Sequence, residues 1–231
     1  MDVNALTFDV FGTVVDWRSG VIREGRRQFP DADVDWPAFA DAWRETYRPS
    51  MDEIRDGDRE WRTIDELHRE AVEELVEQFG LETDAAERDE LNRAWHRLDP
   101  WPDVLPGLRR LRSDYFRTTL SNGNVRLLAN MAKRAGLPWD LILSAELSGH
   151  YKPDREVYRT AAELLDEDPG DVLMVAAHEH DLDGAAAAGL RTAYVHRPQM
   201  WGPDGDVSWP ERDAYDIVVE DFEALASVLG C

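Results

Sequence analysis

The sequence contains almost no cysteine and no long apolar run. Cys231 is the one cysteine among 231 residues, so no disulfide can form within the chain, and a reducing compartment is the simplest interpretation. No stretch of about 18 apolar residues exists to cross a membrane. The first residues, Met-Asp-Val-Asn-Ala-Leu, lack the basic and then apolar pattern of a signal peptide. We therefore expect a cytoplasmic protein, built as one large domain or as a core with an insert.

Basic residues are scarce, and lysine is nearly absent. The chain has 26 basic and 48 acidic residues and a net charge of −22. Such a polyanion repels nucleic acids and anionic lipids, so we expect neither as a partner. Lys133 and Lys152 are the only lysines. High acidity with few lysines resembles proteins of salt-accumulating microbes, in which ions screen the repulsion between carboxylates; an acidic mesophilic enzyme is the alternative.

The apolar patterns predict an α/β fold with a helical insert. Residues 3–9 have the pattern of a first strand, and the charged segment of residues 17–95 has the spacing of amphipathic helices. One such helix is indicated by the i, i+3, i+4 spacing of Trp36, Phe39, Ala40, Trp43 and Tyr47. We therefore expect an α/β core formed by residues 1–16 and 97–231, and a helical cap formed by residues 17–96.

The rest of the chain alternates between strand and helix patterns, as in a parallel sheet covered by helices on both faces. Strands are predicted at residues 117–121, 141–144, 171–177, 192–195 and 216–219. Helices are predicted at about 105–113, 124–136, 154–166 and 181–189.

A carboxylate ends the first predicted strand. Asp9 precedes a Gly-Thr turn in the stretch Asp9-Val-Phe-Gly-Thr13, and open α/β sheets bind ligands at the carboxyl ends of their strands. The stretch resembles the nucleophile loop of the haloacid dehalogenase superfamily, in which most phosphatases carry a second Asp where this chain has Phe11. A phenyl ring cannot transfer protons but can line a pocket for a carbon–halogen bond. The resemblance therefore indicates the (S)-2-haloacid dehalogenase (type II)-like branch, which has a Rossmann-like parallel sheet and an inserted α-helical cap.

Two further motifs follow in the order that this family has. Ser121 ends a predicted strand and Asn122 follows it, where a hydroxyl and an amide can bind an anion by hydrogen bonds. The resemblance implies that Ser121 helps to orient Asp9 and that Asn122 helps to receive the halide. Lys152, one of the two lysines, matches the catalytic lysine of the family and would keep the Asp9 carboxylate ionised and oriented. Tyr158 matches an active-site tyrosine of the family, but a ring that packs in the core is an equal alternative.

The predicted cap contains candidates for anion binding. Arg44 aligns with the arginine that the family uses for the substrate carboxylate and the departing halide, two anions that a rigid guanidinium suits. Arg48, one helical turn later, is an alternative. Trp61 could line the pocket or pack in the core.

The fourth motif departs from the family. Phosphatases of the superfamily place a metal-binding Asp near Ala177, so a Mg²⁺ site is incomplete here and we expect no metal and no cofactor. Dehalogenases have Ser at the position of Ala176 and Asn at that of His178, followed by an Asp that matches Asp181. We expect either His178, as a base, or Asp181 to activate water; a His-rich strand end without a catalytic role is the alternative.

The resemblance implies a metal-independent hydrolase of short 2-haloalkanoic acids. Asp9 would displace the halide and form an ester, and water would then release the 2-hydroxy acid. The expected partner is a small-molecule 2-haloacid, and the family resemblance also allows a homodimer. Two alternatives stay open, namely a Mg²⁺-dependent small-molecule phosphatase of the same superfamily and a non-catalytic binding protein on this scaffold.

Overall fold

The structure, a computed structural model that describes residues 3–231, contains one parallel sheet with six strands in the order β3-β2-β1-β4-β5-β6. All neighbouring strands are parallel, which confirms the predicted fold class. The strands are β1 (Ala5–Phe8), β2 (Phe116–Ser121), β3 (Leu141–Ser144), β4 (Val172–Ala176), β5 (Arg191–Val195) and β6 (Ile217–Val219). Because β1 is central, the residue that follows it reaches the middle of the carboxyl edge of the sheet.

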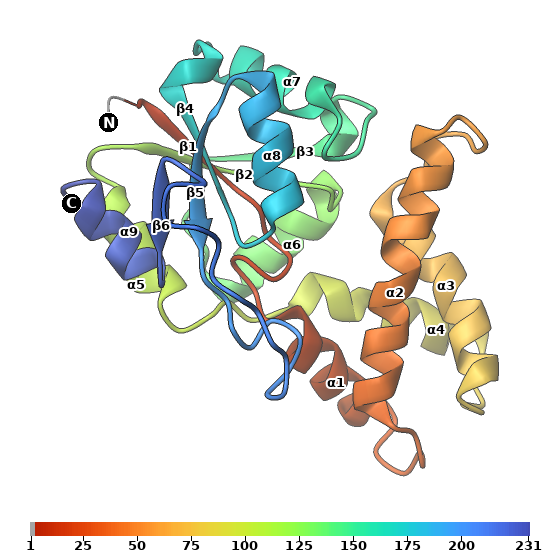
Figure 1. Cartoon of the computed structure of the whole chain (residues 1–231). Coiled ribbons are helices and arrows are strands. Elements are labelled where there is room, and N and C mark those ends of the chain that lie inside the picture. Colours follow the sequence, from red (N-terminus) through yellow and green to blue (C-terminus); the bar gives the residue numbers. More distant parts are fainter. Residues whose placement is uncertain (1–2) are drawn as a thin grey trace.

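Helices cover both faces of the sheet (Figure 1). Residues of α5 (Val104–Leu111), α6 (Val125–Ala135) and α9 (Phe222–Val228) share one hydrophobic cluster. Residues of α7 (Arg155–Leu165) and α8 (Glu179–Ala188) share the other. Side chains of β1 alternate between the two clusters, with Leu6 and Phe8 on the first face and Ala5 on the second. This alternation follows from the two-residue repeat of a strand.

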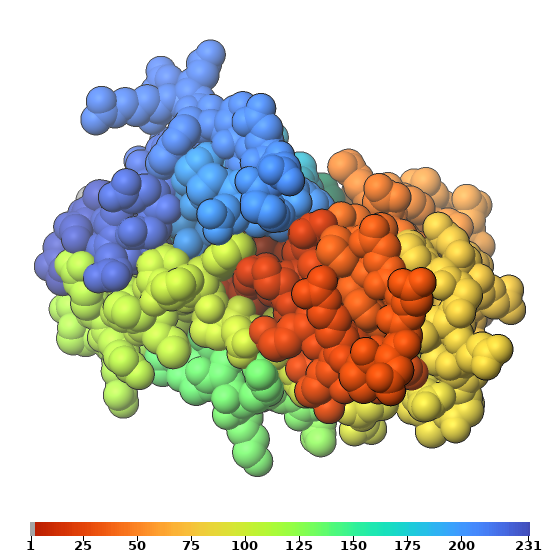
Figure 2. Space-filling model, turned by 90° about the horizontal axis from the view of Figure 1, so that it is seen from below, coloured from red at the N-terminus to blue at the C-terminus, as the bar shows by residue number. Residues whose placement is uncertain are grey.

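The segment between β1 and α5 is helical. It contains α1 (Trp17–Gln28), α2 (Trp36–Arg55), α3 (Ile64–Gln78), α4 (Ala85–Asn92) and the 3₁₀ helix η1 (Arg93–Arg97). Helix α3 begins with a reciprocal capping box between Thr63 and Glu66, and α4 begins with one between Asp84 and Glu87. Such caps satisfy the backbone N–H groups that a helix start leaves free. In the space-filling view the orange and yellow surface of this segment lies to one side of the green and blue core (Figure 2).

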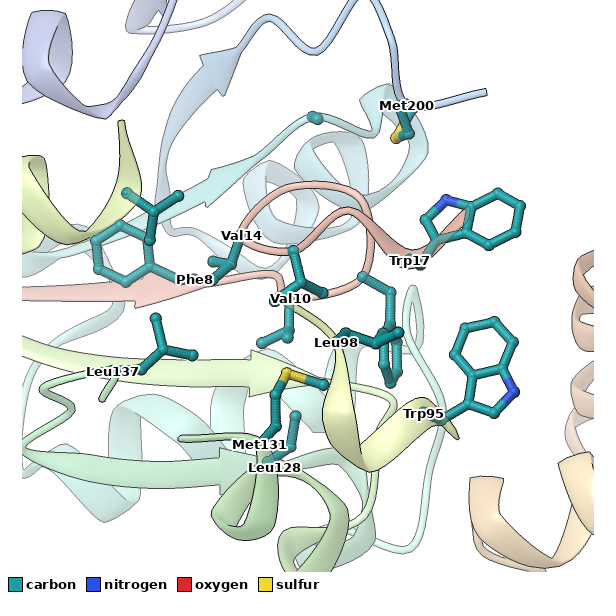
Figure 3. Close-up of a cluster of buried hydrophobic side chains, with 14 of the residues drawn as sticks. Phe8, Val10, Val14, Trp17, Trp95, Leu98, Leu128, Met131, Leu137 and Met200 are labelled. Atoms are coloured by element: carbon teal, nitrogen blue, oxygen red, sulfur yellow. The ribbon is translucent and has the colours of Figure 1, made fainter. Parts of the chain in front are cut away.

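Tryptophans connect the helical segment with the loop after β1. The indoles of Trp17 and Trp95 are fully buried and stack with ring centroids 6.1 Å apart, and Trp43 meets Trp95 edge to face at 5.5 Å. Phe11 meets Trp95 in the same way at 5.6 Å. Trp17 and Trp95 lie at one end of the apolar cluster drawn in Figure 3. Aromatic contacts of this kind add to the free energy of burial, so they hold the helical segment against the nucleophile-like loop.

Two short 3₁₀ helices complete the described chain, η2 (Ala145–Leu147) and η3 (Pro169–Asp171). Among residues 3–231, no helix has the length and the apolar content needed to cross a membrane.

Candidate active site

Asp9 lies at the carboxyl end of β1, in a tight loop that is held by hydrogen bonds. The Thr13 hydroxyl donates to Asp9 Oδ2 at 2.6 Å, and the Ala177 N–H donates to Thr13 Oγ1 at 2.9 Å. The second bond fixes the direction of the first, because it occupies an acceptor lone pair of the hydroxyl. Gly12 has a φ of 91°, a left-handed conformation that glycine adopts without strain. The loop therefore presents Asp9 Oδ2 to Thr13, and Asp9 Oδ1 faces the site.

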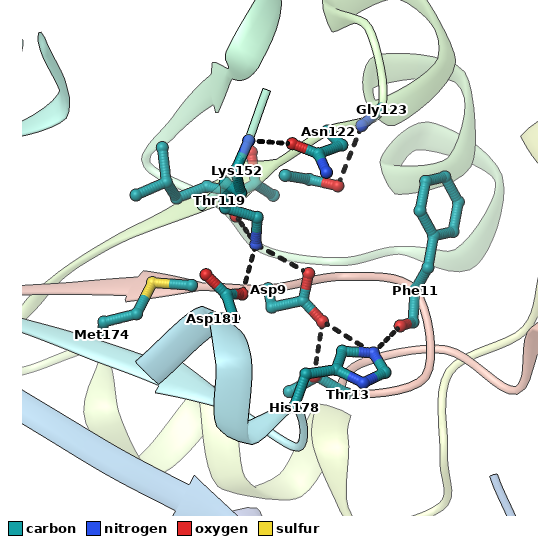
Figure 4. A network of polar contacts seen from close by, with 12 residues as sticks. Asp9, Phe11, Thr13, Thr119, Asn122, Gly123, Lys152, Met174, His178 and Asp181 are labelled. Carbon is teal, nitrogen blue, oxygen red and sulfur yellow. Dashed lines mark hydrogen bonds and ion pairs between the residues drawn. The ribbon is translucent and has the colours of Figure 1, made fainter. Parts of the chain in front are cut away.

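Lys152 lies between two buried carboxylates. Its Nζ donates to Asp9 Oδ1 at 2.9 Å, to Asp181 Oδ2 at 2.5 Å and to the Leu120 carbonyl oxygen at 2.9 Å. These three acceptors use all three protons of the ammonium. The three side chains come from different parts of the sheet edge and converge on one point (Figure 4).

This arrangement separates the pKa values of the two acids. Burial alone would raise the pKa of Asp9, but Lys152, His178 and Thr13 outweigh it and hold the pKa at about 2. For Asp181, burial raises the pKa, and the nearby charge of Asp9 adds to this increase against the opposing effect of Lys152. Burial would lower the pKa of Lys152, but the charges of Asp181 and Asp9 raise it above its ordinary value. Two carboxyl groups with opposite pKa shifts suit different chemical roles.

Tyr158 supports Asp181. Its hydroxyl donates to Asp181 Oδ1 at 2.7 Å, and the ring is fully buried. Burial raises the pKa of Tyr158, so the hydroxyl keeps its proton. Gly184 allows this approach, because a Cβ at that position would lie 2.8 Å from the Tyr158 hydroxyl oxygen. The ring is thus both a core side chain and a hydrogen-bond donor at the site.

Asn122 and Ser121 have different surroundings. Asn122 Oδ1 accepts a hydrogen bond from the Lys152 backbone N–H at 2.8 Å, and its Nδ2 lies 3.3 Å from Met51 Sδ of α2. Ser121 is fully buried and its Oγ accepts from the Gly123 N–H at 3.1 Å. Within residues 3–231, no hydrogen bond joins Ser121 to Asp9. The expected direct orientation of Asp9 by Ser121 therefore has no counterpart in the structure; the hydroxyl shapes the loop that carries Asn122.

Arg44 of α2 lines the same cavity as Asp9, and within residues 3–231 it forms no ion pair with an acidic side chain. Its guanidinium carbon lies 4.0 Å from the centroid of the Tyr47 ring and 5.7 Å from that of Trp17. Nε and Nη1 are buried and have no hydrogen-bond partner among the described residues. A partly buried cation with donors that lack a partner is suited to bind an anion. Arg48, in contrast, is 73% exposed and lies 3.8 Å from Asp52.

Two cavities that share several lining residues lie between α2 and the sheet. The inner one has a volume of about 30 Å³, and the outer one has a volume of about 580 Å³. The inner cavity is lined by Asp9, Phe11, Arg44, Tyr47, Asn122, Lys152, His178, His180 and Asp181. Trp61 lines neither cavity and instead stacks on Tyr151 with centroids 4.5 Å apart. A larger cavity of about 770 Å³, lined by charged residues of α3, η1 and α6, does not include the paired carboxylates.

The sequence reasoning missed three residues of the inner site. Thr13 stands in the motif that contains Asp9, and its hydroxyl contacts the nucleophile-like carboxylate. Tyr47 lies three residues after Arg44, the spacing that places two side chains on one helix face. His180 also lines the inner cavity, and burial lowers its pKa to about 4. The spacing of Tyr47 from Arg44 is the signal in the sequence that indicates its place at the site. The same spacing also fits the apolar face of an amphipathic helix, so it does not by itself distinguish a site residue from a core residue.

His178 faces the carboxylate from the start of α8. Its Nε2 lies 2.9 Å from the Phe11 carbonyl oxygen and 3.7 Å from Asp9 Oδ2.

Among residues 3–231, no group of three or more His, Cys, Asp or Glu side chains is arranged to hold a metal ion.

Comparisons with known proteins show which proteins this chain is similar to. Residues 3–189 match a family model described as haloacid dehalogenase-like hydrolase. The chain is 30% identical over 204 residues to (S)-2-haloacid dehalogenase 4A of Burkholderia cepacia, a match that covers 84% of each chain. A crystal structure of an L-2-haloacid dehalogenase superposes with a TM-score of 0.93 at 42% identity, covering 99% of this chain and 100% of the other. A second structure, described as a defluorinating L-2-haloacid dehalogenase, has a TM-score of 0.95 at 44% identity and covers 99% and 96%.

Proposed function

The chain belongs to the haloacid dehalogenase-like hydrolase family and is an enzyme, and we propose that it hydrolyses the carbon–halogen bond of short 2-haloalkanoic acids through an ester on Asp9. The observation that carries this proposal is the hydrogen bond of Asp9 with Lys152 in the same small cavity as Arg44, whose Nε and Nη1 have no hydrogen-bond partner among residues 3–231. A carboxylate of low pKa is present as the nucleophilic anion, and a free cation opposite it can bind the substrate anion and the departing halide.

In the first step, Asp9 Oδ1 attacks C2 of the substrate and the halide leaves with the bonding electron pair. Oδ1 is the freer oxygen, because it accepts one hydrogen bond from Lys152, whereas Oδ2 accepts the short bond from Thr13 and faces His178. Arg44 and the Asn122 amide receive the halide. Attack from the side opposite to the halide inverts C2, so an (S)-2-haloacid gives an (R)-2-hydroxy acid.

In the second step, water attacks the carboxyl carbon of the Asp9 ester. Asp181 takes the proton of this water, because it is the carboxylate that remains at the site once Asp9 is an ester, and burial raises its pKa. Lys152 Nζ lies beside the ester oxygen Oδ1 and can protonate it as the hydroxy acid departs. We therefore assign the activation of water to Asp181.

The helical segment of residues 17–96 acts as a cap in this proposal, over a core formed by residues 1–16 and 97–231. Arg44, Tyr47 and Met51 come from α2, whereas Asp9, Lys152 and Asp181 come from the sheet edge, and both groups line the two cavities. A substrate between them would be closed off from bulk water, which strengthens electrostatic interactions in the site.

The reaction is proposed to need no metal. The cation that compensates the two buried carboxylates is Lys152, and apolar residues, Phe11 and Ala177, stand where phosphatases of the superfamily carry acids. A Mg²⁺-dependent phosphatase is the rival. Fluoride is a further candidate leaving group, because a relative that is 44% identical is described as defluorinating.

A substrate panel tests the proposal. Purified enzyme is incubated with chloroacetate, 2-chloropropionate, fluoroacetate and p-nitrophenyl phosphate, with and without EDTA, and released halide or nitrophenol is measured. We expect halide release in both conditions, and its loss in Asp9→Asn, because a neutral amide is a poor nucleophile. Phosphate ester hydrolysis that depends on Mg²⁺, without halide release, would replace the dehalogenase proposal by the phosphatase.

A further inference from the structure

The imidazole nitrogen of His178 that faces Asp9 already carries a proton. Nε2 lies 2.9 Å from the carbonyl oxygen of Phe11 (Figure 4). A carbonyl oxygen can only accept a hydrogen bond, so Nε2 must be the donor. This holds both for the neutral imidazole and for the imidazolium, since both carry a proton on this nitrogen in that geometry. Nε2 therefore cannot take a proton from water while this bond is present, which argues against the role of base that the sequence suggested for His178.

A second acceptor lies in front of the same N–H. Asp9 Oδ2 is 3.7 Å from Nε2, and an approach of about 1 Å brings such a pair to hydrogen-bond distance. The Thr13 hydroxyl already donates to the same oxygen at 2.6 Å. Oδ2 thus faces two donors, one from the loop after β1 and one from the start of α8, whereas Oδ1 faces Lys152.

We propose that His178 donates its Nε2–H to Asp9 Oδ2 during hydrolysis of the aspartyl ester, and that together with Thr13 it stabilises the negative charge that develops there. This inference rests on the proposed two-step function and assigns a specific role within its second step. Donors that are aimed in advance at a developing oxyanion are among the strongest contributors to catalysis.

The chemistry of the step assigns the charge to Oδ2. Water oxygen bonds to the carboxyl carbon, its proton passes to Asp181, and the electron pair of the C=O bond moves to Oδ2. The pair then returns, the bond from the carboxyl carbon to Oδ1 breaks, and Oδ1 leaves as the hydroxyl oxygen of the product with a proton from Lys152. Lys152 regains a proton from the new Asp9 carboxyl group, and Asp181 releases its proton to solvent. The charge on Oδ2 exists only between these two events.

The surroundings of the ring hold it close to Oδ2. A Cβ on Gly12 would lie 3.3 Å from His178 Nε2 and 2.5 Å from Met200 Sδ, so the imidazole and Met200 pack directly against this glycine. The side chain of His178 is only 12% exposed. A ring packed in this way needs to approach by only about 1 Å when the oxyanion forms, and such a small reorganisation is what preorganised stabilisation requires.

The test compares substitutions at position 178 that separate hydrogen-bond donation from the ability to accept a proton. His178→Gln places an amide N–H at similar reach but has no basic nitrogen, whereas His178→Ala has neither function. Each variant and the wild type are mixed with 2-chloropropionate in a rapid-quench experiment. Chloride release reports the first step, and intact-mass analysis of the Asp9 adduct reports the second. His178→Asn serves as a shorter amide, and melting temperatures report folding.

We expect all variants to release one equivalent of chloride. In His178→Ala the adduct should decay about 100- to 1,000-fold more slowly than in the wild type, the usual effect of removing one oxyanion donor. In His178→Gln it should decay at least about tenfold faster than in His178→Ala, because each restored hydrogen bond is worth about 1.4 kcal/mol or more.

If the Asp9 adduct decays equally slowly in His178→Gln and His178→Ala, the inference is overturned, and His178 acts as a base instead. Wild-type decay in His178→Ala would overturn it as well, because the residue would then have no role in the second step. A wild type that neither releases chloride nor forms an adduct is a different result, since it refutes the proposed function itself and the inference with it.

Discussion

Replacing Lys152 by methionine should destabilise the folded protein and abolish turnover. Methionine has a similar length but no charge, so Asp9 Oδ1 and Asp181 Oδ2 lose the ammonium that lies 2.9 and 2.5 Å from them. The two carboxyl groups then stay buried without a cation. Lys133, the only other lysine, is exposed on α6, and Lys133→Met provides a matched control that removes one positive charge elsewhere.

The structure sets the expected size of the effect. At these distances each attraction amounts to about 6 kcal/mol with an effective dielectric constant of about 20. Most of this is offset by the cost of burying the charges, and removal of one partner from a buried ion pair typically costs about 3–5 kcal/mol. Lys133→Met should change the free energy of unfolding by no more than about 0.5 kcal/mol, as is usual for exposed positions.

The effect of Lys152→Met should depend on pH. In the wild type the pKa of Asp9 is lowered from 3.8 to about 2, so its ionisation stabilises the fold above pH 3.8, and this contribution is lost as the pH falls toward 2. Without Lys152, burial dominates and the pKa of Asp9 moves above its unfolded value. Ionisation then costs stability at high pH, and this cost disappears as the pH falls through the raised pKa.

Urea unfolding at pH 8 and pH 5 measures both effects. The loss in Lys152→Met should be largest at pH 8 and smaller at pH 5, and chloride release should be absent at both. A loss below about 1 kcal/mol at pH 8, where a buried pair should matter most, would refute the assignment of Lys152 as the cation of this site. A larger loss at pH 5 than at pH 8 would refute the pKa argument.

Three further predictions concern the metal, the arginines and the surface charge. EDTA should leave chloride release unchanged, because Lys152 supplies the positive charge; strict recovery on adding Mg²⁺ would contradict this. Arg44→Met should lower kcat/KM for chloride release about 10- to 100-fold through the loss of charged hydrogen bonds, whereas the exposed Arg48→Met should stay within about threefold; equal losses would contradict this assignment. Raising KCl from about 0.1 to about 1 M should raise Tm, because salt screens the repulsion of 22 excess negative charges; a flat or falling Tm would disprove the screening argument.

The sheet and the residues at its carboxyl edge could be predicted because both depend on local patterns. Apolar runs indicated the strands. Asp9 ends one predicted strand, Asn122 follows another, and Lys152 lies in the connection after a third. Parallel strands end at the same edge, so side chains far apart in sequence meet there. The seven-residue helix α9, Phe222–Val228, escaped prediction because so short a segment shows less than two full turns of apolar repeat.

Contacts that depend on side-chain direction could not be predicted. Ser121 is the last residue of β2, directly before Asn122, but it is buried and accepts a hydrogen bond from the Gly123 N–H. Trp61 turns toward Tyr151 rather than the cavity. The sequence also could not show which nitrogen of His178 faces Asp9, and this detail decides between donation and basicity. These features follow from packing in three dimensions, which residue order does not encode directly.

The shared lysine links the two chemical steps through charge. In the free enzyme the negative charge of Asp9 raises the pKa of Asp181, and Lys152 is divided between the two carboxylates. Ester formation removes the charge of Asp9, so the repulsion that raised the pKa of Asp181 disappears and Lys152 is left with one carboxylate. Loss of this repulsion favours the ionised form of Asp181 at the step in which it must accept a proton from water. Because Asp9 and Asp181 share Lys152, the reaction of Asp9 in the first step favours the form of Asp181 that acts as the base in the second step.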